Sequence, residues 1–146
     1  MNISTPIETI QDIRAGITAL QLVCGSTAAS KGFHDDRPKP QDFLGLDWAK
    51  YPAALANWQG NKLLLIVSEV VEAHDEIRTG HAADETYYPN QHVAKPTKPE
   101  GVPSEIADAV IRCFDFAYTE GFSLADIIIE KLQYNASRER LHGKKF

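Results

Sequence analysis

The sequence is poor in cysteine and has no long apolar run, and these absences exclude several classes of protein. Its two cysteines, Cys24 and Cys113, lie far apart without a C-x-x-C pair, so there is no zinc or dithiol redox motif. Each has apolar neighbours at helical spacing, and we expect both to be core thiols. No stretch approaches the roughly 20 apolar residues of a membrane span, and the N-terminus lacks a signal-peptide pattern. We therefore expect a cytoplasmic protein without a membrane partner.

The chain also lacks an excess of basic residues. Its formal net charge is -5 over 146 residues, whereas general nucleic-acid binders usually carry a broad basic surface that replaces phosphate counterions. Hydrophobic residues make up 43% and charged residues 24% of the chain, which is typical of globular proteins. The length suits one sizeable core and is short for two. We expect a single domain over residues 1–146 that does not bind nucleic acid.

Strand-like alternation is absent as well, whereas helical periodicity recurs along the chain. The expected helices cover about residues 6–30, 61–79, 103–121 and 123–139, and the expected loops cover 31–60 and 80–102. Pro6 and Pro103 are first-turn prolines, Gly80 and Gly121 are C-terminal stops, and Ser123 opens an S-x-x-D capping box. Prolines and glycines make 31–60 a loop, with a short helix near Pro52–Asn57. Four such helices predict an all-α four-helix bundle.

Two acidic pairs on two apolar helices are the most informative feature of the chain. Glu69 and Glu72 form one pair, and Glu105 and Asp108 form the other. An i,i+3 spacing directs both carboxylates of a pair from the same helical face. If the two faces meet, four carboxylates converge and repel one another unless a divalent cation neutralises them. Hard oxygen ligands suit Mg²⁺ or Mn²⁺, so we predict a metal centre, with Glu76 as a reserve ligand.

Exposed helices also carry glutamates at i,i+3 for solubility, so a solvated face is the alternative for either pair. Glu69, however, lies inside the apolar run Leu63–Val71, where a solvent-facing helix would be more polar. Arg112 follows Asp108 by four residues, where it could pair with a carboxylate or reach a phosphate, and an ion pair within the helix is the simpler explanation.

A basic stripe is expected on the last helix. Lys131, Tyr134, Asn135 and Arg138 follow i, i+3, i+4, i+7 spacing and so share one face. Two cations and an amide on one face could bind phosphate oxygens. A solvated basic face near a helix C-terminus is the alternative, because cations are favourable there.

Together, the segments SEVVEAHDEIR, SEIADAVIRCFDFA and EKLQYNASRERLHGKKF resemble the MazG-like all-α nucleoside triphosphate pyrophosphohydrolases of the small phage and bacterial type. The resemblance covers about residues 61–146. It implies that Glu69, Glu72, Glu105 and Asp108 hold two or more Mg²⁺ or Mn²⁺ ions. The family has a lysine three residues before Glu105, where this chain has Val102, and the spacer 80–101 is long. Phosphate contact must then come partly from elsewhere.

The resemblance implies hydrolysis of nucleoside triphosphates to monophosphate and pyrophosphate, for control of the nucleotide pool. Purine deoxynucleotides such as dGTP or dATP are the expected substrates. Glu72 is expected to orient the attacking water, while the basic stripe binds the phosphates and sugar. The family assembles with sites at subunit interfaces, so we expect a homo-oligomer, a tetramer rather than a dimer. A phage-encoded chain would act in the host cytoplasm.

Three residues of the segment that covers the nucleotide in related proteins are base-side candidates: His34, Trp48 and Trp58. Aromatic faces can stack on a base, and core packing is the alternative for each tryptophan. Two rival functions are open. A noncatalytic helical interaction protein would need no metal, and a di-iron carboxylate bundle needs two E-x-x-H motifs, of which the chain has one, Glu139 to His142.

Overall fold

The computed structural model describes residues 7–45, 47–89, 92 and 96–139, with the side chains of residues 7 and 8 left aside. It contains four α-helices, α1 (Ile7–Ser30), α2 (Lys50–Arg78), α3 (Val102–Glu120) and α4 (Leu124–Ser137), and a short 3-10 helix, η1 (Pro40–Phe43). Over these ranges there is no strand, and Tyr87 and Glu100 form an isolated antiparallel bridge. The expectation of an all-α fold is confirmed.

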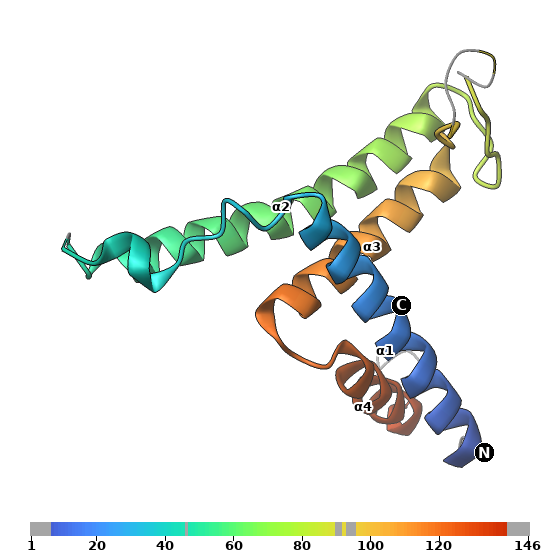
Figure 1. Cartoon of the computed structure of the whole chain (residues 1–146). Coiled ribbons are helices and arrows are strands. Elements are labelled where there is room, and N and C mark those ends of the chain that lie inside the picture. Colours follow the sequence, from blue (N-terminus) through green and yellow to red (C-terminus); the bar gives the residue numbers. More distant parts are fainter. Residues whose placement is uncertain (1–6, 46, 90–91, 93–95, 140–146) are drawn as a thin grey trace.

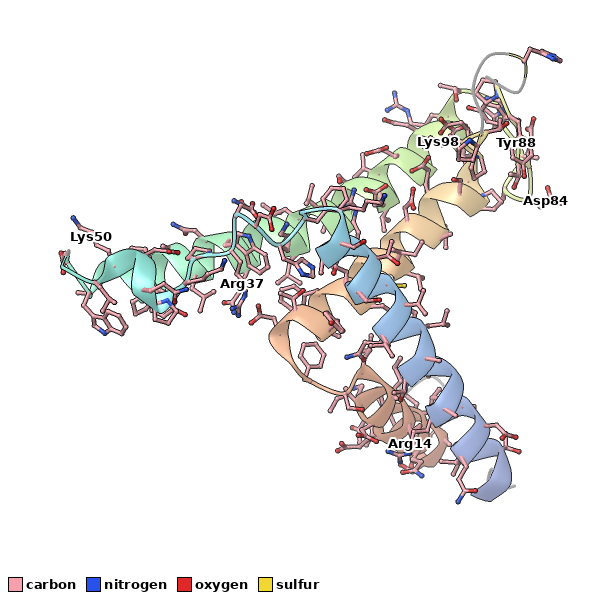
Figure 2. The ribbon with its side chains drawn as sticks, in the orientation of Figure 1. Arg14, Arg37, Lys50, Asp84, Tyr88 and Lys98 are labelled. Carbon is pink, nitrogen blue, oxygen red and sulfur yellow. The ribbon has the colours of Figure 1, made fainter. Side chains whose placement is uncertain are left out.

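The helices form an open arrangement (Figure 1). α2 and α3 run antiparallel and pack along the C-terminal half of α2, while α1 packs on both α3 and α4. The N-terminal half of α2 projects away from the other helices, with Lys50 at its tip (Figure 2). This arrangement is compatible with an all-α bundle, although one copy does not close around a central core. None of the described helices is long and apolar enough to cross a membrane.

The start of α2 corrects the sequence prediction. A loop was expected up to residue 60, but the helix already begins at Lys50. Pro52 lies in the first turn, where the missing N–H would have no helical partner. Gly60 lies inside the helix, at a cost of about 1 kcal/mol relative to alanine. The short helix expected near Pro52–Asn57 is therefore part of α2, whereas α1, α3 and α4 lie within two residues of the expected ranges.

The turn between α3 and α4 is fixed by local sequence. Gly121 ends α3 with a left-handed φ of 75°, which glycine adopts without strain. The Ser123 hydroxyl accepts a hydrogen bond from the Asp126 N–H at 3.2 Å and so caps α4. The amide of Gln21 in α1 donates to the Phe122 carbonyl at 2.8 Å and accepts from the Leu124 N–H at 3.1 Å. These bonds attach α1 to the turn.

α1 approaches α3 closely at Gly25. This glycine is buried, and a Cβ atom built on it would overlap the Tyr118 ring. Ala117, next to Tyr118, is fully buried at 0% exposure. The missing side chain of Gly25 thus allows α1 to lie close against Tyr118 of α3.

One copy of the chain has a small core and large uncovered apolar faces. Among the residues that the structure describes, the buried hydrophobic ones are Trp58, Ala73, Val102, Ala109, Phe114, Ala117, Ala125 and Ile129. The accessible surface is 10847 Å², whereas a compact monomer of this mass exposes about 7,500 Å². Exposed apolar residues gather on α2, with Leu63, Val67 and Val70 on one stripe. Cys24 and Cys113, expected in the core, are half-buried free thiols, and burial raises the pKa of each.

Candidate functional site

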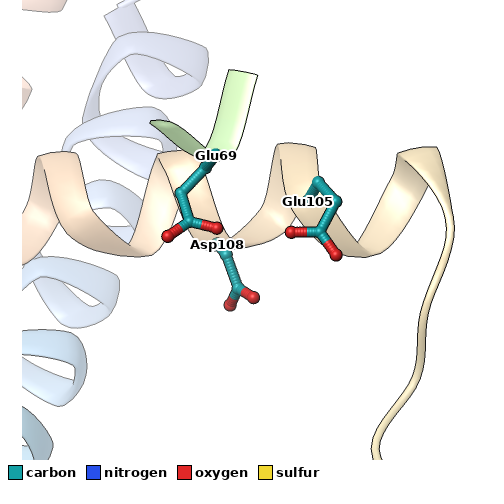
Figure 3. A group of neighbouring side chains, drawn as sticks. All are labelled: Glu69, Glu105 and Asp108. Carbon is teal, nitrogen blue, oxygen red and sulfur yellow. The ribbon is translucent and has the colours of Figure 1, made fainter. Parts of the chain in front are cut away.

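Three carboxylates from two helices converge where α2 packs on α3. Glu69 of α2 and Glu105 and Asp108 of α3 each place one carboxylate oxygen within 4.8 Å of the other two (Figure 3). We call these three residues the acidic cluster. Glu69 is 5% exposed and Glu105 is 4% exposed. The antiparallel contact of α2 and α3 brings Glu69 of the first sequence pair to both members of the second pair. Four carboxylates were expected to converge, and Glu72, the fourth, is exposed and lies outside this group.

Burial and mutual repulsion make the acidic cluster costly to ionise. Burial raises the pKa of Glu105, Lys98 lowers it, and the charges of Glu72, Asp108 and Glu69 raise it further. Glu72 is exposed, so it acts on the acidic cluster from outside. Buried charges need a partner or a metal ion. The donor set is made entirely of carboxylate oxygens, which fits a hard divalent cation such as Mg²⁺ or Mn²⁺.

Arg112 neutralises part of this charge. Its Nε donates to Glu69 Oε1 at 2.5 Å. The simpler expectation was a pair with Asp108 within α3, but the partner seen here belongs to the neighbouring helix. Because Glu69 is buried and the guanidinium is 39% exposed, the bond also fixes how α2 is rotated against α3.

Lys98 is a cation near the acidic cluster that the sequence patterns did not reveal. Its Nζ donates to Glu100 Oε2 at 2.9 Å, and this bond, together with the charges of Glu105 and Asp108, raises the Lys98 pKa. The paired backbone bonds of Tyr87 and Glu100, at 2.9 and 3.1 Å, hold the loop at the start of α3. Val102, where the family has a lysine, is buried. Lys98 thus supplies a positive charge near the N-terminal end of α3 (Figure 2).

A pocket of about 660 Å³ adjoins the acidic cluster between α1, α2 and α3. Asp108 and Arg112 belong to its wall, so the pocket and the acidic cluster share a boundary. Its apolar wall includes Val23, Phe33, Trp58, Leu65, Ile111 and Phe116, and its polar wall includes Thr27, Lys31, Lys62, Asp115 and Thr119. A cavity of this size, with mostly apolar walls and few polar groups, suits a small organic ligand.

One of the three base-side candidates, Trp58, lines this pocket. Trp58 belongs to the wall, and its Nε1 donates to Asp36 Oδ1 at 2.9 Å. His34 does not line the pocket, but its ring contacts the carboxylate of Asp115, which does. Trp48 is 53% exposed, precedes α2, and packs against Tyr51 with ring centroids 5.7 Å apart. In one chain, Trp48 is therefore apart from the pocket.

The basic stripe stands apart from the acidic cluster in the same chain. Lys131, Tyr134, Asn135 and Arg138 are all exposed. Lys131 Nζ and the Arg138 guanidinium lie 5.4 and 5.5 Å from the centre of the Tyr134 ring. The expected helix continued to residue 139, but α4 ends at Ser137 and the backbone of Arg138 is extended, so helical spacing does not determine the position of Arg138. α4 packs on α1, and none of the four residues lines the pocket or belongs to the acidic cluster.

Two further sequence candidates lie outside the acidic cluster. Glu76, the reserve ligand, accepts a hydrogen bond from the Tyr87 hydroxyl at 3.2 Å and lies 3.7 Å from His81 Nε2. These contacts tie it to the loop after α2. Glu139 is exposed beyond the end of α4, and its expected partner in the E-x-x-H motif, His142, lies outside the described residues.

Comparison with known proteins adds no family evidence. The chain matched no protein-family model, no curated protein and no solved structure. Its function is therefore inferred from its residues and their geometry.

Proposed function

We propose that this protein is a metal-dependent nucleoside triphosphate pyrophosphohydrolase that serves nucleotide pool control. It would cleave the bond between the α and β phosphates and release a nucleoside monophosphate and pyrophosphate. The observation that carries the proposal is the shared boundary of the acidic cluster and the pocket at Asp108. A nucleotide in the pocket would thereby present its phosphates to the carboxylates.

Glu69, Glu105 and Asp108 are the residues that would hold Mg²⁺ or Mn²⁺, because their oxygens converge and two of them are buried. Bound divalent ions, two or more in the proposed site, supply charge neutralisation at the phosphates and lower the pKa of a nearby water. Glu72, exposed beside the acidic cluster, would orient the attacking water. Purine deoxynucleotides are the proposed substrates.

Cations for the phosphates would come from two sources. Lys98 acts on the acidic cluster within the chain. Lys131, Asn135 and Arg138, with Tyr134 between them, would serve the acidic cluster of a second copy, since they are exposed and lie apart from their own. This arrangement requires a homo-oligomer, proposed as a tetramer, in which the apolar stripe of α2 is covered.

The excess of accessible surface supports this assembly. A single copy exposes 10847 Å² against about 7,500 Å² for a compact monomer, which leaves ample apolar area for interfaces of the usual 1,200–2,000 Å² or more. Size measurement in solution is expected to show an oligomer. A monomer with full turnover would contradict the assembly.

Product analysis tests the reaction. The protein is incubated with each common ribo- and deoxyribonucleoside triphosphate in Mn²⁺, Mg²⁺ or EDTA, and the products are separated by anion-exchange chromatography. Metal-dependent monophosphate without diphosphate is expected. Glu105→Gln should abolish it, while Glu130→Gln, a matched change at an exposed position of α4, should not. No product, combined with no effect of metal on melting temperature, would favour a noncatalytic helical interaction protein.

A further inference from the structure

A second carboxylate lies in the pocket at a distance from the acidic cluster. Asp115 belongs to the pocket wall and follows Asp108 by seven residues on α3. Seven residues are close to two helical turns, so both side chains leave the same face of the helix, and a rise of 1.5 Å per residue separates them by about 10 Å along the axis. Asp115 is not needed for the metal centre, and its presence in a mostly apolar pocket requires another explanation.

Contacts with His34 and Thr119 hold Asp115 in place. His34 Nε2 lies 2.7 Å from Asp115 Oδ1, and the two side chains are 17% and 19% exposed. The Thr119 hydroxyl donates to the Asp115 carbonyl at 2.9 Å and lies 3.0 Å from His34 Nε2. The His34 ring stacks near Tyr118, with centroids 6.4 Å apart. These contacts fix one carboxylate oxygen, while no described residue bonds Oδ2.

Two of the three cations in the pocket wall, Lys62 and Arg112, are engaged elsewhere. Lys62 Nζ donates to the Phe33 carbonyl at 2.7 Å and lies 4.9 Å from the centre of the Trp58 ring. Arg112 bonds Glu69. The negative charge of Asp115 reaches the neighbouring Cys24 thiol, whose pKa is raised by burial and by that charge. Asp115 therefore offers the pocket a fixed hydrogen-bond acceptor.

We infer that Asp115 reads the edge of the base and selects guanine. An ionised carboxylate can only accept, and each of its oxygens has two lone pairs. Oδ2 and the second lone pair of Oδ1, the oxygen that His34 contacts, therefore suit a pair of adjacent N–H donors. Guanine presents such a pair, N1–H and the 2-amino group, on one edge. Adenine and cytosine place a ring-nitrogen acceptor beside the amino donor, and uracil and thymine flank one N–H with two carbonyls. Each of these would face the carboxylate with a repelling lone pair or an unmade bond.

This inference rests on the proposed function, which places the phosphates of the ligand at the acidic cluster and therefore its base at the other end of the pocket. With its α-phosphate at Asp108 and its base at Asp115, a guanine nucleotide would lie along α3, across Ile111 and Arg112 in the pocket wall. The apolar walls would cover the faces of the base while the acceptor fixes its edge. Deoxyguanosine and guanosine nucleotides share this edge, so the sugar is a separate variable.

Calorimetric titration with nucleoside monophosphates tests base reading without hydrolysis. The full-length protein with Mn²⁺ is titrated with dGMP, dAMP, dCMP and dTMP. We expect dGMP to bind at least about tenfold more tightly than the others. Deoxyinosine monophosphate, which lacks the 2-amino group, should bind about tenfold more weakly than dGMP. This comparison changes the ligand alone, so it decides the inference even if a variant at Asp115 does not fold.

Asp115→Asn keeps the shape of the side chain and replaces one acceptor by a donor. We expect it to lose the preference for dGMP and to bind the xanthine monophosphate better, because the amide can donate to the 2-carbonyl and still accept from N1–H. Asp84→Asn, an exposed loop aspartate far from the pocket (Figure 2), is the matched control and should change neither affinity.

The outcomes separate the two proposals. Hydrolysis of triphosphates without a preference for guanine, or with that preference intact in Asp115→Asn, would overturn the inference and leave the proposed function standing. Selective dGMP binding that Asp115→Asn abolishes, without hydrolysis of any triphosphate, would support the inference and overturn the proposed function. Neither hydrolysis nor selective binding would overturn both.

Discussion

The pair α2 and α3 buries charged side chains at its contact, whereas the pair α1 and α4 leaves them exposed. Where α2 packs on α3, Glu69 and Glu105 are almost fully buried, and burying a carboxylate costs several kcal/mol unless it is compensated. Where α4 packs on α1, Arg14 and Asp126 pair with side chains 50% and 51% exposed, and Lys131 is exposed. Such charges cost almost nothing. A buried carboxylate that destabilises the fold indicates function, whereas an exposed basic face is compatible with simple solvation.

The largest expected effect comes from removing a charge of the acidic cluster. Glu105→Gln should lower metal-dependent turnover by about 100-fold or more, because it removes a proposed ligand. The same change should raise the melting temperature in EDTA at pH 7, since it relieves burial and repulsion of that carboxylate. Glu130→Gln on α4 should change neither quantity.

The pH dependence sharpens this prediction. Because the folded protein raises the Glu105 pKa above its ordinary 4.5, the folded state holds that proton more tightly than the unfolded chain does. Without metal, the contribution of Glu105 to stability should therefore fall as pH rises above 4.5. The stabilising effect of Glu105→Gln in EDTA should be small at low pH and grow toward neutrality. A constant difference between the two proteins across this range would argue against a costly carboxylate.

The next largest effect concerns the contact of α1 with α3, which joins the pair α2 and α3 to the pair α1 and α4. Gly25→Ala would place a methyl group into the Tyr118 ring, and overpacking of this kind typically costs about 1–3 kcal/mol. Gly16→Ala on the same helix meets no atom within 4 Å, so it should stabilise the protein by about 0.5–1 kcal/mol through helix propensity. Urea unfolding of both variants measures the difference. Equal effects would mean that α1 does not approach α3 as described.

A smaller effect is expected from the basic stripe. Lys131→Met should leave stability within about 0.5 kcal/mol of the wild type but lower kcat/KM about tenfold if the stripe binds phosphate in a neighbouring copy. Lys50→Met, at the exposed tip of α2, is the matched control. Mixing Lys131→Met with Glu105→Gln subunits should restore part of the activity. If mixing restores nothing, the stripe and the acidic cluster belong to no shared site.

The smallest effect is the coupling between Arg14 and Asp126. A double-mutant cycle with alanine at both positions should give about 0.2–1 kcal/mol, decreasing with added salt. A value of several kcal/mol would place this pair among the strongly coupled charges and would remove the contrast between the two helix pairs.

Local sequence determines most of the helix ends, and tertiary packing determines the rest of the site. Gly121 and Ser123 act through their own backbone, so the turn between α3 and α4 is readable from the sequence. Judged from the sequence alone, Pro52 and Gly60 indicate the end of a helix. The structure shows that α2 continues through both residues. The start of α2 was therefore missed.

The same distinction applies to the candidate site. Glu69, Glu105 and Asp108 lie on regular helices, so spacing predicts their faces, and the contact of α2 with α3 brings them together. Lys98 reaches the acidic cluster along a loop, and its position depends on the bridge between Tyr87 and Glu100. Asp115 was not recognised because a lone aspartate on a helix carries no pattern, and its meaning depends on His34 from a distant loop.

One face of α3 carries Glu105, Asp108, Arg112 and Asp115, so a single helix fixes the spacing between the reacting end and the base end of the proposed nucleotide. The two ends can change independently by substitution but not by insertion. One added residue between Asp108 and Asp115 would rotate one end by about 100° relative to the other and destroy both alignments. A single substitution at position 115 would instead redirect base choice and leave the metal end untouched, which makes altered specificity reachable in one evolutionary step.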